Sequence, residues 1–526
     1  MPALTHRRAL GWIAAGWAVC CFSFFQFLLP YHLFFKEQMQ LFLLTWEYFL
    51  SYQDKPAWLA CYAGDFLTQF FYLRGGGAAT LSLVLLVEYL LTVSVLRRIG
   101  WKRYAAPFAL LPTGVDAFLH CGLYYGLAAS TSVILTLFAF LLFTQIKPPT
   151  WTLLGGLLVL PCLHAMAGAS FILFPVLVAI YAWRRGGSGL RRYVPVLLIP
   201  VALLYPTVAR PCYLLTIGQA YRYPFPSSLN VRGVDAVRET ILSLAVEAGR
   251  GNWGEVGRRA AASGVSNAIV AYYANIASSQ QGRLAEDLLS RYQPFAGGLF
   301  LPVSSQSGWL TISFSHEVWY HLGDVQMAQH SAMLGMIFSP RHRSAQMLRR
   351  LAEIHRLGGD AAVADKYDRI LDATLFRRRM ERREAPSCEP SVVRKDTLRT
   401  ASDYVASLEL LADAHPGGPA VDYLLCYHLL NKDVAAFASA YDHYRKGRPG
   451  DRLPHIYAEA LLIRLAAGQA SVEELQSYDI PRETIVAFMD YTRLYEQSGG
   501  SAGRLRERFG QGYWFYYHFA TYETGE

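Results

Sequence analysis

The stretch AATLSLVLLVEYLLTVSVLRRIGWKR, residues 78–103, indicates the class of fold to which the first part of the chain belongs. Residues 78–96 form one apolar run in which Glu88 is the only charged side chain. Four basic residues follow that run: Arg97, Arg98, Lys102 and Arg103. A hydrocarbon core about 30 Å thick needs roughly 20 helical residues to cross. A run of this length with a basic flank is predicted to be a transmembrane helix.

Similar apolar runs lie on both sides of this stretch. Residues 9–29 and 122–144 also reach the required length. Four shorter runs are predicted to be short or proline-broken spans: 105–120, 150–164, 169–183 and 193–209. The sequence therefore predicts a polytopic bundle of about seven transmembrane helices in residues 1–210.

The basic residues of this half are unevenly placed. With seven spans, the loops on one side hold 11 Lys and Arg, whereas the loop at 30–77 on the other side holds only three: Lys36, Lys55 and Arg74. Basic residues in short loops mark the cytoplasmic side. The N-terminus is predicted to lie inside, and an odd number of spans puts everything after residue 210 outside the cytoplasm.

An alternative reading treats 150–183 as one long helix. The C-terminal half would then return to the cytoplasm. Lys147 and Arg184 would, however, lie on opposite faces of the membrane, against the charge rule. We therefore favour seven spans.

Composition excludes several classes of protein. The 526-residue chain has a net charge of +9, and residues 1–209 account for most of it with 14 Lys and Arg against 6 Asp and Glu. Because the excess lies between apolar runs, no nucleic-acid partner is predicted. The eight cysteines form no CxxC pair or Cys/His cluster, and no cofactor-binding motif is present.

Residues 231–526 change to amphipathic helices joined by short turns, without period-2 strands. Gly323 and Asp324 predict one turn, and Gly358 to Asp360 predict another 35 residues later. This spacing is typical of tetratricopeptide-type (TPR-like) repeats, whose helix pairs stack into a solenoid. The spacing drifts outside 320–376, so an irregular helical domain is the alternative. The expected fold is all-α, with a transmembrane bundle and an extracytoplasmic helical-repeat domain.

Three other stretches stand out in this half. Residues 293–307 are rich in Gly and Pro and are predicted to be a long loop, and residues 377–390 are predicted to be a charged connector. The aromatic run at 513–519 is predicted to pack the last helix and not to form a ligand platform, because aromatic residues dominate helical cores.

Polar side chains within apolar runs are candidate functional residues, because an ionisable group in hydrocarbon is costly. Glu88 lies near the middle of its span, and His120 and His164 lie toward the outer ends of theirs. Each could belong to a proton relay or a substrate site, or could be a hydrogen-bonded packing residue.

The outer loop at 30–77 is too long for a turn and too apolar for a free loop. Glu37 lies immediately outside the first span. A following amphipathic helix is predicted to lie in the membrane interface with four apolar residues toward the acyl boundary: Leu41, Leu44, Phe49 and Leu50.

Two resemblances extend this interpretation. FKEQMQLF at 35–42, GDFLTQFFYLRGGG at 64–77, NIASSQQGRLAEDLL at 275–289, LPHIYAEALL at 453–462 and GYWFYYHF at 512–519, together with the GD-turn repeats, resemble an uncharacterised family of bacterial integral membrane proteins, known by a domain of unknown function. That resemblance covers most of the chain. It implies a Gram-negative inner-membrane location and no particular activity.

The layout of the first half also resembles multi-spanning glycosyltransferases that use polyprenyl-phosphate sugars. This resemblance implies that Glu37 and Asp116 would be catalytic acids, with His120 close by, and that they could bind a divalent cation. The chain departs from that pattern because Gln38 follows Glu37 and neither outer loop carries a DxD or DE pair.

The preferred function at this point is a membrane-anchored scaffold whose solenoid binds a protein or glycan partner outside the cytoplasm. The alternative is a lipid-linked sugar transferase that uses Glu37 and Asp116. A transporter built around Glu88 is a third class, but no inverted repeat with broken helices supports it.

Overall fold

A computed structural model describes residues 2–146, 149–184, 190–227, 231, 233–376, 403–445 and 453–521. Within these ranges the chain is helical and contains no strand, which confirms the all-α prediction. It divides into two compact units: unit 1 comprises Met1–Glu239 and Ile370–Met380, and unit 2 comprises Thr240–Arg369 and Glu381–Glu526. The charged connector predicted at 377–390 lies outside the described residues.

Unit 1 contains the apolar helices. Four described helical stretches are long and apolar enough to cross a membrane: Arg8–Leu28, Gly76–Ile99, Thr152–Arg184 and Val196–Tyr213. The helices of unit 1 are α1 (Pro2–Leu28), α2 (Pro30–Gln38), α3 (Trp46–Leu50), α4 (Trp58–Thr68), α5 (Gly76–Ile99), α6 (Ala105–Leu119), α7 (Leu127–Phe143), α8 (Pro149–Ala167), α9 (Leu173–Arg184), α10 (Leu190–Ala209) and α11 (Ile217–Ala220).

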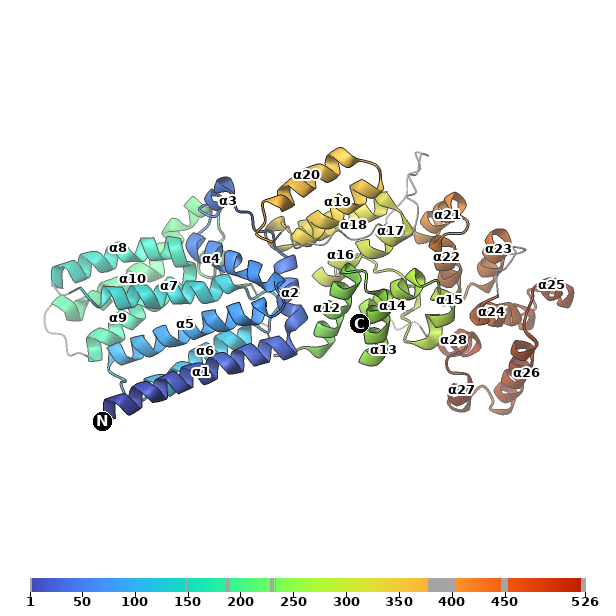
Figure 1. Cartoon of the computed structure of the whole chain (residues 1–526), viewed down its shortest axis with the longest axis horizontal. Helices are drawn as coiled ribbons and strands as arrows, with labels where there is room; N and C mark the ends of the chain where they lie inside the picture. The colour runs from blue at the N-terminus through green and yellow to red at the C-terminus, as the bar shows by residue number, and fades with distance from the viewer. Residues whose placement is uncertain are drawn as a thin grey trace. The chain divides into compact units, whose positions relative to one another are not determined.

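The long stretch Thr152–Arg184 contains a reversal of the chain. Gly168, at the start of a short 3₁₀ turn, has a φ of 66°, a left-handed conformation that an α-helix cannot continue through. Side-chain packing gives the directions: the ring of His164 packs on Tyr205 of α10, and so does the ring of Phe171 after the turn. α8 and α9 are therefore two antiparallel passes, and Figure 1 shows α1 and α5 to α10 lying alongside one another in alternating directions.

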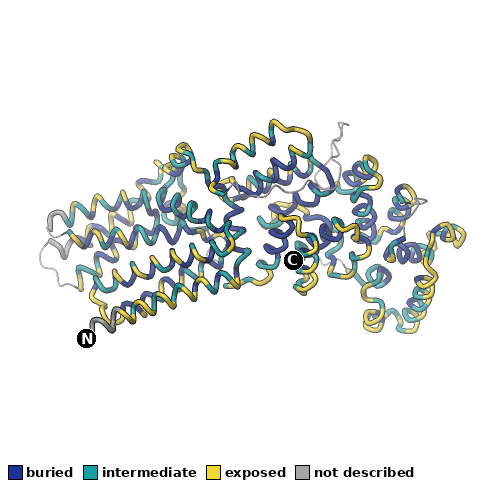
Figure 2. Tube along the Cα trace, viewed as in Figure 1, coloured by how far each residue is buried: buried dark blue, intermediate teal, exposed yellow. Residues whose placement is uncertain are grey.

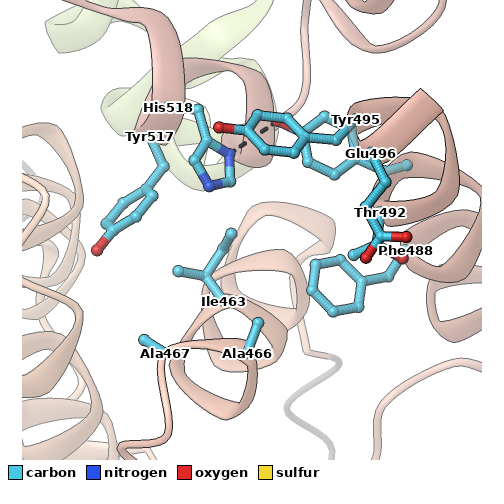
Figure 3. Close-up of a pocket in the computed structure, with 10 residues that line it drawn as sticks. Ile463, Ala466, Ala467, Phe488, Thr492, Tyr495, Glu496, Tyr517 and His518 are labelled. Carbon is cyan, nitrogen blue, oxygen red and sulfur yellow. Dashed lines mark hydrogen bonds between the residues drawn. The ribbon is translucent and has the colours of Figure 1, made fainter. Parts of the chain in front are cut away.

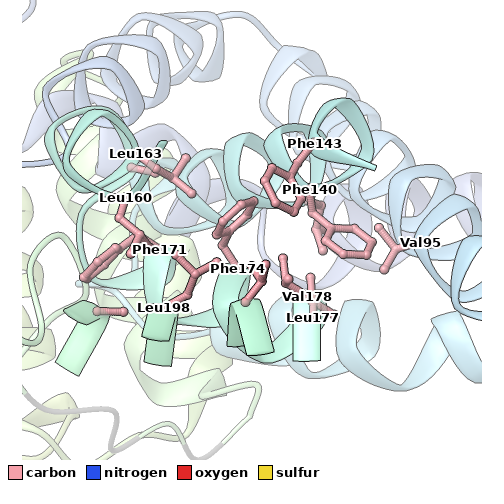
Figure 4. Close-up of a cluster of buried hydrophobic side chains, with 14 of the residues drawn as sticks. Val95, Phe140, Phe143, Leu160, Leu163, Phe171, Phe174, Leu177, Val178 and Leu198 are labelled. Atoms are coloured by element: carbon pink, nitrogen blue, oxygen red, sulfur yellow. The ribbon is translucent and has the colours of Figure 1, made fainter. Parts of the chain in front are cut away.

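A cluster of large apolar side chains holds the later passes together. Phe140 and Phe143 of α7 meet Phe174 of α9 and Leu160 of α8, all of them buried (Figure 4). Phe143 and Phe174 pack edge to face with their ring centroids 5.1 Å apart. Relative to exposure to water, burial of each of these aromatic side chains contributes roughly 1.5–3 kcal/mol of stabilising free energy.

The outward surface of the bundle is also apolar. Figure 2 shows exposed residues along the outer face of α1. The exposed side chains on the bundle helices include Leu83, Leu111, Leu158, Leu204 and Val208. A surface this apolar is unusual for a water-soluble unit and suits a lipid solvent.

The loop at 30–77 folds back on the bundle as α2, α3 and α4. α4 lies so close to α7 that a Cβ atom at Gly64 would collide with the backbone of Ala128. The hydroxyl of Thr131 donates to the carbonyl of Ala60, 2.8 Å away. The predicted interfacial helix is only the five-residue α3. Leu41 is buried, whereas Leu44, Trp46 and Leu50 are exposed.

Unit 2 consists of shorter helices joined by tight turns. Gly323, with a φ of 83°, ends α17, and the carboxylate of Asp324 accepts from the backbone N–H of Met327 to begin α18. The helices from the end of unit 1 onward are α12 (Ala236–Gly249), α13 (Trp253–Ser263), α14 (Ala268–Gln280), α15 (Leu284–Asp287), α16 (Trp309–Phe314), α17 (His316–Leu322), α18 (Val325–Ile337), α19 (Ala345–Leu357), α20 (Ala361–Asp372), α21 (Tyr404–Ala414), α22 (Pro419–Leu430), α23 (Val434–Tyr444), α24 (His455–Ala466), α25 (Val472–Gln476), α26 (Arg482–Gln497), α27 (Ala502–Phe509) and α28 (Tyr513–Phe519).

A buried ion network ties α17 to α19 in unit 2. The guanidinium of Arg350 donates to Glu317 at 2.6 Å and to Glu353 at 2.9 Å. It also lies 4.0 Å from the ring centre of Tyr320. All three charged side chains are buried, and Arg350 is the guanidinium that Glu317 and Glu353 share; Arg349 also donates to Glu353 at 3.2 Å.

Candidate functional site

A cluster of buried polar side chains lies in unit 1 around Asp116 of α6. Tyr125 donates to one carboxylate oxygen at 2.5 Å and Ser130 donates to the other at 2.6 Å. His120, one helical turn after Asp116, places its Nε2 atom 2.8 Å from the Ser130 hydroxyl and 3.7 Å from the carboxylate. The structure therefore brings Asp116 and His120 together, and both carboxylate oxygens are already hydrogen-bonded.

Glu88 of α5 belongs to the same cluster. It is buried and makes a side-chain hydrogen bond with Asp116. Two carboxyl groups can share such a bond only if one of them holds a proton. Its Oε2 atom has no hydrogen-bond partner among the described residues. The cluster thus joins an acid from the middle of α5 to polar groups at the end of α6.

Lys36 of α2 lies at the end of the cluster that contains His120 and Tyr125. The sequence did not identify Lys36 as a candidate functional residue. Its ammonium group donates to the carbonyl oxygens of His120 and Tyr125, at 3.0 and 2.9 Å. The ring of His32 lies 3.2 Å from the same His120 oxygen. Burial lowers the pKa of Lys36 to about 7. The one available signal was a lysine on the apolar side of FFKEQ, and that pattern also fits a side chain that reaches the interface.

Glu37 does not join Asp116 and His120. Among the residues that the structure describes, its carboxylate is hydrogen-bonded to the neighbouring Gln38 alone. Burial raises the pKa of Glu37 to about 8. The two acids that the glycosyltransferase resemblance implies are therefore not part of one hydrogen-bonded group.

His164 lies in an aromatic environment at the end of α8. Its ring packs edge to face against Phe171 and Tyr205, with ring centroids 5.0 and 5.2 Å apart, and lies 6.0 Å from the ring of Tyr213. Its backbone carbonyl accepts from the N–H of Ala57 at 3.3 Å. These contacts make His164 part of the packing that joins α8 to α10 and to the loop at 30–77.

Unit 2 has a pocket of about 220 Å³ between α24, α26 and α28 (Figure 3). Aromatic rings form most of its wall, and small side chains of α24 form its floor. The lining residues are Ile463, Ala466, Ala467, Phe488, Tyr491, Thr492, Tyr495, Glu496, Tyr517 and His518. A concave, mostly apolar wall with a few polar groups is the usual form of a small binding site.

Three polar groups of this pocket are engaged within the wall. The Tyr491 hydroxyl lies 2.8 Å from Nδ1 of His518 and donates to the carbonyl of Trp514. The Thr492 hydroxyl donates to the carbonyl of Met489. Partial burial lowers the pKa of His518, so its ring is neutral at pH 7. Glu496 is the remaining ionisable group, and its side chain is exposed.

The aromatic run at 513–519 has two parts in the structure. Tyr513 and Trp514 are buried, as the sequence predicted for packing residues. Tyr517 and His518, in contrast, line the pocket. The sequence could not separate these roles because the ring that faces a pocket and the ring that fills a core are the same residue types.

No group of three or more His, Cys, Asp or Glu side chains that could hold a metal ion is found in the described part of the chain. Comparison with curated proteins finds no match, and comparison with solved structures also finds none. The profile of a family of unknown function (DUF6057) matches residues 5–520, which is nearly the whole chain. The chain therefore belongs to this family of unknown function.

Proposed function

We propose that the protein is a membrane-anchored scaffold of the bacterial inner membrane. In this proposal unit 1 crosses the bilayer seven times with its N-terminus inside. Unit 2 is then a TPR-like helical-repeat domain outside the cytoplasm that binds a protein or glycan partner. The observation that carries the proposal is the contrast between an accessible aromatic pocket in unit 2 and a polar cluster in unit 1 whose Asp116 oxygens are both occupied.

Aromatic and basic residues at one end of the bundle support the membrane part. Trp12, Trp101 and Trp183 are exposed there, as is common where a helix meets the membrane–water interface. The guanidinium of Arg184 lies 5.5 Å from the ring centre of Trp101. Because α1 begins and α5 and α9 end at this end, its basic residues fit the cytoplasmic side.

Consecutive helices of unit 2 support the scaffold part. α17 packs on α18 and α18 on α19, and α21 to α23 pack in the same sequential manner. Ala328 and Ala332 are fully buried on α18, which lets the neighbouring helices approach closely. Helix pairs that pack mainly on their chain neighbours expose long lateral surfaces, and such surfaces bind partners.

A lipid-linked sugar transferase is the second candidate, because Asp116 and His120 share one hydrogen-bonded cluster with Glu88. A divalent cation would be its expected cofactor. It ranks second for two reasons. The Glu37 carboxylate is hydrogen-bonded to Gln38 and not to this cluster. Asp116 would also have to lose its hydrogen bond from Tyr125 or Ser130 before it could bind a substrate.

Complementation of a strain that lacks the gene separates the two candidates. For a scaffold, Glu37→Gln and Asp116→Asn should restore the wild-type envelope phenotype, and deletion of residues 403–521 should not. Immunoblots of the membrane fraction control for abundance. Restoration by the deletion would remove the scaffold proposal. Loss with Asp116→Asn at normal abundance would favour the transferase.

A further inference from the structure

The wall of the unit 2 pocket continues along α26 as an exposed apolar stripe. Ile485, Met489, Thr492 and Glu496 follow one another at spacings of four, three and four residues, so they lie on one face of the helix. Ile485 and Met489 are exposed, whereas Thr492 and Glu496 line the pocket. A ligand in the pocket can therefore extend onto an apolar surface, as a polypeptide segment would.

The charge of the pocket favours a cation. The side chain of Glu496 makes no hydrogen bond or ion pair with another described residue, and His518 is neutral at pH 7 because burial lowers its pKa. Within the described part of unit 2, the cation–aromatic contacts go to other rings: Tyr320, Phe509, Phe515 and Tyr516. The rings of Tyr495 and Tyr517 thus meet no cation from the residues that the structure describes.

The hydrogen-bonding groups of the pocket are fewer than its lining suggests. The hydroxyls of Tyr491 and Thr492 and the Nδ1 atom of His518 are bonded within the wall, and the Glu496 carboxylate is the one charged acceptor among the remaining lining groups. A planar cation needs only an aromatic face and one carboxylate. Guanidinium matches both, because it stacks on rings and donates two parallel bonds to a carboxylate.

We propose that this pocket binds the arginine side chain of a partner polypeptide, with the guanidinium between Tyr495 and Glu496 and flanking apolar residues on Ile485 and Met489. The inference rests on the proposed function and specifies the chemistry of its partner. It assigns Glu496 as the charge-selecting residue and Tyr495 as the stacking residue.

Binding of short peptides to the full chain in lipid nanodiscs tests the inference. The probes are acetyl-Leu-Arg-Leu-amide, its uncharged citrulline counterpart and N-acetylglucosamine. The arginine peptide should bind about tenfold more tightly than the citrulline peptide, because a charged bidentate pair is lost. Glu496→Gln should weaken it about tenfold. Tyr495→Ala should weaken it, and Tyr495→Phe should retain it. Glu483→Gln, at the exposed start of α26, is the matched control and should leave binding unchanged.

Other outcomes overturn the inference. Equal binding of the two peptides, no binding of either, or full binding by Glu496→Gln contradicts a cation site; far-ultraviolet circular dichroism confirms that the variants are folded. Binding of N-acetylglucosamine that Tyr495→Ala abolishes would replace arginine by a glycan and leave the scaffold proposal intact. The scaffold proposal fails separately, through the complementation experiment.

Discussion

Unit 1 and unit 2 distribute their polar groups in opposite ways. In unit 1, the side chains of Glu88, Asp116 and Lys36 are buried, and leucine and valine side chains are exposed on the outside of the bundle. In unit 2 most of the exposed surface is polar, and the buried charges of Arg350 and Glu317 are paired at short distance. The two arrangements suit two solvents, because a polar group needs a partner wherever water is absent. The difference teaches that the solvent of each unit can be inferred from which side chains face outward.

The largest effect is expected from Arg350→Met in unit 2. The substitution leaves the buried carboxylate of Glu317 without its guanidinium and leaves Glu353 paired with Arg349, which should cost about 3–5 kcal/mol of unfolding free energy. Urea unfolding of the full chain in micelles, followed by tryptophan fluorescence, measures the change. Arg356→Met is the control, since the Arg356 side chain is 50% exposed and its pair with Asp368 should contribute below about 1 kcal/mol. Equal effects of the two variants would contradict the buried network.

A lysine on the outer face of the bundle tests the proposed difference in solvent directly. Leu83 of α5 and Val486 of α26 are both 60% exposed. Leu83→Lys should cost about 2.5–3.5 kcal/mol of membrane insertion, because a central charge meets hydrocarbon. Val486→Lys should cost almost nothing in water. Membrane yield and thermal unfolding of both variants measure this contrast, and equal tolerance of both lysines would remove the lipid-facing assignment.

Glu37→Gln tests the burial of an acid in unit 1 through the pH dependence of that unit's stability. Burial raises the pKa of Glu37 to about 8, so the folded chain holds a proton that the unfolded chain releases above its ordinary pKa. The stability of unit 1 should therefore fall as pH rises from about 4.5 to 8. The amide should flatten this dependence and add on the order of 1–3 kcal/mol at pH 7. Thermal unfolding in micelles from pH 5 to 8 measures it. Gln38→Ala retains the acid and removes the amide donor that lowers its pKa, so the pH dependence should persist in that variant. An unchanged slope in Glu37→Gln would contradict the burial of Glu37.

The smallest effect is expected at Glu239, where unit 1 ends. Its carboxylate accepts from the backbone N–H groups of Tyr31 and His32, at 2.7 and 3.0 Å, and so caps the first turn of α2. Glu239→Ala should cost about 0.5–2 kcal/mol, the range for losing a helix cap. Hydrogen exchange at Tyr31 and His32 should rise. Asp235→Ala, which removes the carboxylate that accepts from the backbone N–H and the guanidinium of Arg238, should leave that exchange unchanged.

Periodicity and composition predicted much of this fold. Apolar runs gave the helices of unit 1, and Gly323 with Asp324 gave a turn that the structure confirms. Whether the helix pairs of unit 2 are true repeats remains a prediction. The five-residue α3 was harder to anticipate, because its length depends on tertiary contacts such as those of Leu41 and Tyr48.

The candidate sites were harder to predict from the sequence than the helices were. Asp116 and His120 lie four residues apart, so a helix brings them together by local geometry alone. Lys36 reaches His120 across 84 residues, and no local pattern encodes that contact. The pocket is formed by α24, α26 and α28, and the sequence did not indicate which aromatic faces of those helices stay open.

The left-handed conformation of Gly168 reverses the chain between α8 and α9. In the proposed topology, this one residue therefore determines on which side of the membrane unit 2 lies. A side chain there would collide with the carbonyl of Tyr223 and would strain the backbone as well. If the bundle lies in a bilayer as proposed, a branched residue at 168 favours a straight helix from α8 into α9 and removes one crossing. Unit 2 would then be delivered to the opposite compartment, and Gly168→Val with an alkaline phosphatase fused to the C-terminus should lose the enzyme's periplasmic activity.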